Sequence, residues 1–138
     1  MTEAGFNKKM RSTPLVLAIA FGMSLAGLPL SAHHSFAAEY DGKKPIQLHG
    51  VVTKIDWENP HVYIYLDVKD DEGMVVNWAL EGHPPNTLRR TGWVKGALKV
   101  GDIISVTGWH SKDDSYRIAG REVTLPDGKK LYLGPPSE

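Results

Sequence analysis

Apolar and polar residues alternate with a period of two along much of the chain after residue 45, which is typical of β-strands with one buried face. Residues 61–68 show this most clearly, because four apolar residues alternate with four polar or aromatic ones: Val62, Ile64, Leu66 and Val68 with His61, Tyr63, Tyr65 and Asp67. Residues 75–81 continue the pattern after Asp70–Gly73, which has the composition of a hairpin turn. The pattern predicts two paired strands, one face of each in the core.

Further strands are expected at 46–57, 103–109 and 116–125, with a short extension at 130–133. In the first of these the apolar residues change face near Gly50, which predicts a bulge or a sharp bend at that point.

Residues 84–92 have prolines near their start and a glycine at their end, which predicts a short helix between the third and fourth strands. This order of elements predicts an all-β fold, a small five-stranded OB-like Greek-key barrel over residues 45–134. A plain β-sandwich or an SH3-like barrel is the alternative. Trp78 and Trp93 are expected in the core. Residues 33–44 and 135–138 lack periodicity and are expected to form an N-terminal arm and a C-terminal tail.

Residues 1–32 have the three parts of a secretory signal peptide. Lys8, Lys9 and Arg11 give a positive start, residues 15–30 form an uncharged apolar run, and residues 29–32 supply a proline and small residues for cleavage. The apolar run is shorter than the ~20 residues that a membrane-spanning helix needs. We therefore expect a periplasmic or secreted protein, with a retained membrane anchor as the alternative.

The position of cleavage decides which residue begins the mature chain. Cleavage after Ala32 would leave His33 first, whereas cleavage after Ser31 would leave Ala32 first and His34 third. Cleavage after Ala37 would remove both histidines.

Composition excludes several classes of function. The chain has no cysteine, so disulfides, a thiol nucleophile and cysteine-based metal centres are absent. Loss of residues 1–32 removes three of 16 basic and one of 16 acidic residues, which leaves a mature net charge of about −2. An acidic domain is poorly suited to nucleic acid, because that affinity rests mostly on neutralising phosphates. We expect no nucleic-acid partner and no membrane association after cleavage.

Known catalytic motifs are also missing: the sequence has no nucleophile elbow, no phosphate-binding loop and no His-Glu-x-x-His. We therefore predict no catalytic residues and expect a binding protein rather than an enzyme.

Four short motifs carry a resemblance: HHSFAAEY at 33–40, WENPH at 57–61, RTGW at 90–93 and LKVGD at 98–102. With these motifs the chain resembles a family of small exported bacterial proteins that is catalogued only as a domain of unknown function. The resemblance extends from His33 to about Gly134. It implies export and a compact fold, and it implies no activity.

The mature N-terminus predicts a metal site. If His33 is first, its α-amine and imidazole can chelate a metal, and imidazole ligands suit copper. If Ala32 is first, the amine, two backbone amides and the His34 imidazole form a square-planar site instead. His61 is the best candidate for a further ligand. The predicted metal ligands are therefore His33, His34 and His61, and the alternative is that the two N-terminal histidines belong to a solvated tail.

Strand parity places His61 beside further polar groups. A three-residue turn at Asp71–Gly73 pairs residue 63 with 81 and 61 with 83, whereas a turn one residue earlier pairs 61 with 81. His61 is thus expected next to Glu81 or His83.

A second hypothesis assigns this face of the sheet to a glycan, a peptide or a partner protein, because aromatic faces stack on such ligands. Its predicted ligand-binding residues are Trp57, Tyr63, Tyr65, Glu81 and His83. The alternative is that the aromatic residues only form stabilising cross-strand pairs.

Overall fold

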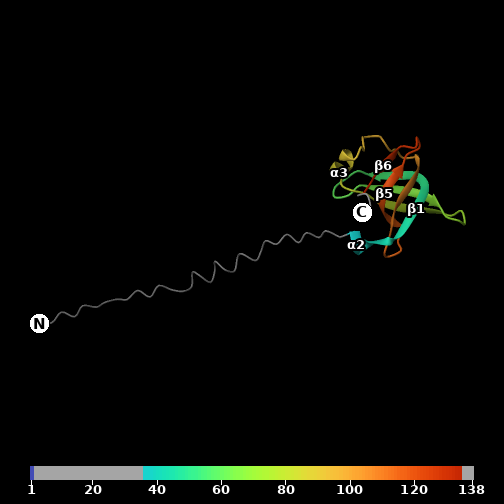
Figure 1. Ribbon diagram of the computed structural model, residues 1–138. Helices are drawn as coiled ribbons and strands as arrows, with labels where there is room; N and C mark the ends of the chain where they lie inside the picture. Colours follow the sequence, from blue (N-terminus) through green and yellow to red (C-terminus); the bar gives the residue numbers. More distant parts are fainter. Residues whose placement is uncertain (2–35, 135–138) are drawn as a thin grey trace. The chain divides into compact units, whose positions relative to one another are not determined.

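The structure, a computed structural model, describes Met1 and residues 36–134. The predicted signal peptide, the predicted ligands His33 and His34, and the predicted tail 135–138 lie outside the described residues. Residues 36–134 form a mostly antiparallel β-sheet with short helices (Figure 1). The elements in chain order are α2 (Phe36–Glu39), β1 (Tyr40–Asp56), β2 (Tyr63–Lys69), β3 (Val75–Glu81), α3 (Pro85–Arg90), β4 (Ile103–Ser111), β5 (Arg117–Thr124) and β6 (Lys130–Tyr132).

The long strand β1 organises the sheet, because its first part pairs with β4 and its last part pairs with β2. Antiparallel pairing continues from β2 to β3 and from β4 to β5. A short parallel pairing then joins β3 to β5, with Glu81 opposite Ala119. Each of the strands β1 to β5 therefore pairs with two of the others, and the pairings form a closed circuit to which β6 adds at β5.

The apolar face of β1 changes at Thr53 rather than at Gly50. Val52 pairs with Leu66 while Lys54 pairs with Tyr65, so Thr53 is an extra residue in this strand. Gly50 is required for a different reason, because a Cβ there would lie 2.4 Å from the backbone oxygen of Asp67. The predicted irregularity is thus present, and the glycine permits close approach of β1 to β2.

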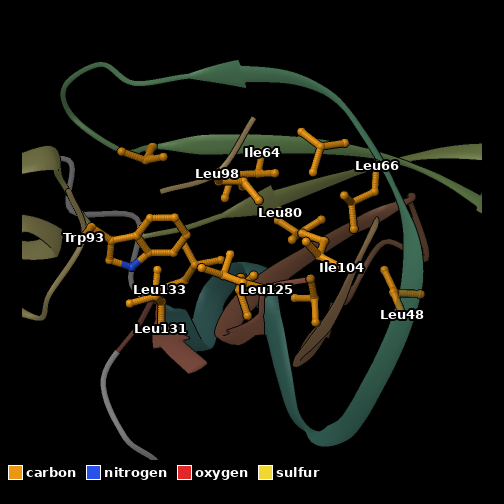
Figure 2. Close-up of a cluster of buried hydrophobic side chains, with 14 of the residues drawn as sticks. Leu48, Ile64, Leu66, Leu80, Trp93, Leu98, Ile104, Leu125, Leu131 and Leu133 are labelled. Atoms are coloured by element: carbon orange, nitrogen blue, oxygen red, sulfur yellow. The ribbon is translucent and has the colours of Figure 1, made fainter. Parts of the chain in front are cut away.

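The core takes its side chains from every long strand, and Figure 2 shows part of this cluster. The alternating residues Val62, Ile64 and Leu66 are fully buried. Each such side chain stabilises the fold by about 1.5–3 kcal/mol relative to exposure. Trp93 is buried as predicted, whereas Trp78 is only partly buried and packs at the edge of the core.

Strand β3 has the predicted bounds, and α3 lies within the predicted helical segment. Strand β1, however, begins at Tyr40, so the expectation that it starts at Ile46 was wrong. The physical reason is that Tyr40 is buried and pairs with Ser111 of β4, a contact between distant segments. Among the described residues, no helix has the length and apolar character needed to cross a membrane.

Candidate functional site

The candidate site lies at the end of the β2–β3 hairpin that is remote from its turn. Tyr63 pairs with Glu81, and the backbone N–H of Val62 donates to the carbonyl of His83 at 3.3 Å. This is the register predicted for the three-residue turn. It brings together His61, Glu81 and His83, as strand parity indicated.

The Glu81 carboxylate is the centre of this group, and its side chain is only 15% exposed. One oxygen, Oε1, is in contact with Nδ1 of His61. The other, Oε2, accepts a hydrogen bond from the Tyr40 hydroxyl at 2.5 Å. The carboxylate therefore joins β3 to β1 and to the segment that precedes β2. We call the residues Tyr40, His61, Tyr63, Glu81 and His83 the Glu81 cluster.

The surroundings raise the pKa of both phenols of the cluster. Burial raises the pKa of Tyr40 far above its ordinary value, and the hydrogen bond to Glu81 and its charge raise it further. Burial also raises the pKa of Tyr63, with a further contribution from the Glu81 charge. Both effects favour the neutral phenol, because a second negative charge beside a carboxylate in a poorly hydrated site is costly.

Arg117, at the start of β5, provides positive charge beside the cluster and counters part of this effect on both phenols. Its guanidinium lies 3.6 Å from Glu39 of α2 and 3.4 Å from Asp113. Arg117 therefore connects the first described helix to the cluster. Sequence reasoning missed Arg117, because its position depends on the parallel pairing of β5 with β3.

The imidazole of His61 is 40% exposed and is held at Nδ1 by Glu81. Among the described residues, its other ring nitrogen, Nε2, has no hydrogen-bond partner. The neighbouring His83 has its pKa lowered, mainly by burial and then by the proximity of His61. Lowering the pKa favours the neutral imidazole, which is the form that can bind a metal.

The described residues do not contain a complete metal site. Within 36–134, no group of three or more His, Asp or Glu side chains is arranged to hold a metal ion. His61, Glu81 and His83 are close to one another, yet they do not form such a group.

The aromatic residues of the predicted ligand-binding surface have different neighbours. Tyr63 and Tyr65 lie on β2, where Tyr63 is near Glu81 and the Lys54 ammonium lies 5.1 Å from the centre of the Tyr65 ring. Trp57 contacts Trp93 instead, with 5.8 Å between ring centres. The structure therefore brings Trp57 into contact with Trp93.

Trp57 and Trp93 also line a pocket of about 370 Å³. Its wall includes the apolar residues Ile55, Val94 and Leu98 and the cationic residues Arg89 and Lys95, together with Gly96. The pocket was not predicted from sequence, because it combines the end of β1 with the segment after α3. We call it the tryptophan pocket.

Comparison with known proteins identifies a family and nothing more specific. No curated protein and no solved structure matches the chain. One family model, described as a family of unknown function (DUF6152), matches residues 22–119. The match covers more than half of the chain and includes the residues of the Glu81 cluster. The chain therefore belongs to this family of unknown function, DUF6152.

Proposed function

We propose that the chain is an exported binding domain with an OB-like barrel fold, and that it binds copper through its mature N-terminal histidines and His61. The barrel is supported by the circuit of pairings through β1, β2, β3, β5 and β4. The position of α3 between β3 and β4 supports it as well, because small Greek-key barrels of this class have their helix there.

The observation that carries the copper proposal is the contact between His61 Nδ1 and Glu81 Oε1. Histidines that bind metals usually donate their second ring N–H to a carboxylate or a carbonyl. This contact fixes the tautomer and the direction of the ring, so that Nε2 is presented as a ligand. The Tyr40 hydroxyl in turn holds the same carboxylate in place.

The remaining ligands in this proposal come from the N-terminus. Cleavage after Ala32 creates an α-amine with a pKa of ~7.7–8, which loses its proton readily to a competing metal. That amine and the imidazole of His33 supply two nitrogens, and His61 supplies the third.

The test uses protein exported by a bacterial host and purified without added metal. The intact mass identifies the first residue, and a copper titration followed by spin resonance is carried out on the same sample. We expect a chain that begins at His33 and a copper signal with three nitrogen ligands. A chain that begins at Ala38 would overturn the proposal, because it lacks both N-terminal histidines.

Variants then assign the ligands. His61→Ala is expected to remove one nitrogen from the signal and to weaken copper binding by about tenfold or more. His49→Ala is the matched control, because His49 is exposed and its Nδ1 contacts Ser105 Oγ instead. A double variant of His33 and His34 to alanine should lose tight binding altogether. Unchanged affinity in that double variant would refute the proposal.

A glycan or an extended peptide that binds across the strand β2–β3 face is the second candidate function. The partly exposed rings of Tyr63 and Tyr65 on β2, with Glu81 and Lys54 beside them, favour it. For this function, ligand binding in the presence of a chelator should be lost in Tyr63→Ala. A ligand that binds Tyr63→Ala as tightly as the unaltered protein would exclude this candidate.

A further inference from the structure

The tryptophan pocket has a rigid apolar base. Trp93 is buried, and its indole N–H donates to the backbone oxygen of Tyr132 at 2.8 Å. Leu98 is buried beside it, and Ile55 is partly buried and packs against the core. Because these side chains are already held by the core, the base of the pocket is formed before a ligand arrives. A preformed base reduces the entropy that binding costs.

The rings of the pocket offer a surface for a flat ligand. The planes of Trp57 and Trp93 are inclined at 50° to each other. Trp57 is only partly buried, so part of its ring surface is accessible to a ligand. Pockets that bind small molecules usually combine such apolar and aromatic walls with a few polar groups, and their volumes begin at ~300 Å³. The observed volume of about 370 Å³ suits one small molecule rather than a chain of sugars.

The charged residues of the pocket all have the same sign. Its wall contains Arg89 and Lys95, and it contains no acidic residue. Both cations are exposed, and in the described part of the chain neither forms an ion pair. Arg89 has only a long hydrogen bond of 3.4 Å to Asn86 of its own helix. Two cations without carboxylate partners beside an apolar pocket are complementary to an organic anion.

We propose that the tryptophan pocket binds a small aromatic carboxylate, with the ring against Trp57 and Trp93 and the carboxylate between Arg89 and Lys95. Arg89 can hold a carboxylate through two parallel hydrogen bonds, whereas Lys95 contributes a single mobile charge. This site is separate from the Glu81 cluster, and it requires no metal and no N-terminal residue.

The test is a calorimetric titration of the exported protein, in the presence of a chelator, with naphthoate as the probe. Its uncharged alcohol, naphthylmethanol, is the matched ligand. We expect naphthoate to bind about tenfold or more tightly than the alcohol, because a charged partner roughly doubles the strength of a hydrogen bond. Equal affinity for the two probes would overturn the proposal, since the cations would then have no role.

Variants test where the probe binds. Arg89→Gln and Lys95→Gln are each expected to weaken naphthoate binding several-fold, and together by about thirtyfold. Arg90→Gln is the matched control, because Arg90 is the next residue of α3, is also exposed and does not line the pocket. Unchanged binding in the Arg89 and Lys95 double variant, or an equal loss in Arg90→Gln, would contradict the proposal.

Two further measurements exclude other occupants. In NMR spectra of the indole N–H groups, naphthoate should shift the signal of Trp57 and leave that of Trp78 in place. Sedimentation at the same protein concentration should show no change in mass when the probe is added. A dimer that the probe dissociates would mean that the pocket is filled by a second copy of the chain, and it would refute the proposal. A shift at Trp78 alone would refute it as well.

Discussion

The Glu81 cluster and the tryptophan pocket differ in the burial and the pairing of their charged groups. Glu81 is largely buried, and its carboxylate is held by Tyr40 and His61. The cations of the pocket are exposed and have no ion-pair partner within the described residues. A buried carboxylate that has its own donors is part of the structure, and it acts on a ligand only by orienting His61. Exposed unpaired cations contribute little to the fold and are available to a ligand. We therefore expect variants of the cluster to change stability and variants of the pocket to change binding.

Replacement of Glu81 by alanine should change the stability of the protein more than any other variant of this comparison. It leaves the buried hydroxyl of Tyr40 without an acceptor and removes the partner of His61 Nδ1. A buried polar group without a partner costs about 1–3 kcal/mol, so we expect the unfolding free energy to fall by about 2–3 kcal/mol. Urea unfolding followed by tryptophan fluorescence measures this change.

The matched control for Glu81→Ala is Glu72→Ala, because Glu72 is exposed in the β2–β3 turn. We expect Glu72→Ala to change stability by less than about 0.5 kcal/mol. Equal stability of the two variants would show that the Glu81 carboxylate is not part of the folded framework.

The dependence of stability on alkaline pH should show the effect of the buried phenol of Tyr40. Its pKa is raised above the ordinary value of 10.0 in the folded protein, so only the unfolded chain releases this proton just above pH 10. The contribution of Tyr40 to stability is therefore complete below that pH and is lost as the pH rises above it. One additional proton released on unfolding lowers the unfolding free energy by about 1.4 kcal/mol per pH unit.

The corresponding variant is Tyr40→Phe, which has no proton to release. Between pH 10 and 11.5 its stability should fall less steeply than that of the unaltered protein, although it begins lower because the bond to Glu81 is missing. Urea unfolding at a series of pH values gives both slopes. Parallel slopes would mean that the Tyr40 hydroxyl ionises as freely in the folded protein as in the unfolded chain.

A double-mutant cycle on the unfolding free energy distinguishes residues that interact with each other from residues that act independently. Tyr40→Phe removes the hydroxyl that Glu81→Ala leaves without an acceptor, so the two changes should not be additive. We expect a coupling energy of about 1–2 kcal/mol in unfolding experiments. The same cycle on Arg89 and Lys95 should give additive effects within about 0.5 kcal/mol. A coupling below that limit in the first cycle would contradict the assignment of the cluster to the folded framework.

Short-range patterns predicted the hairpin of the candidate site well. Alternation identified the buried face of residues 61–68 and the bounds of β3, and parity predicted that His61 lies next to Glu81 or His83. Both inferences depend only on the period of a strand and on the length of one turn. Neither requires knowledge of a distant segment.

Long-range contacts explain what the sequence could not predict. Tyr40 was expected in an arm, because residues 33–44 show no clear apolar periodicity. Its place in β1 depends on pairing with Ser111, which is distant in the sequence. Arg117 joins the site only through the parallel pairing of β5 with β3. The apolar face of β1 changes at Thr53, which has no partner residue in β2. The prediction placed this change near Gly50, because a glycine often marks a bulge. A conspicuous aromatic residue in an aperiodic segment is the one signal that could have indicated Tyr40.

Substitutions of the two cations of the tryptophan pocket should have the smallest effect on stability. Arg89 and Lys95 are exposed, and within residues 36–134 they have no ion-pair partner to lose. Substitutions at such positions usually change the unfolding free energy by no more than about 0.5 kcal/mol. Arg89→Gln and Lys95→Gln are therefore expected to unfold at the same urea concentration as the unaltered protein. If either variant instead lost as much stability as Glu81→Ala, its cation would belong to the folded framework, and the contrast between a structural carboxylate and two available cations would fail.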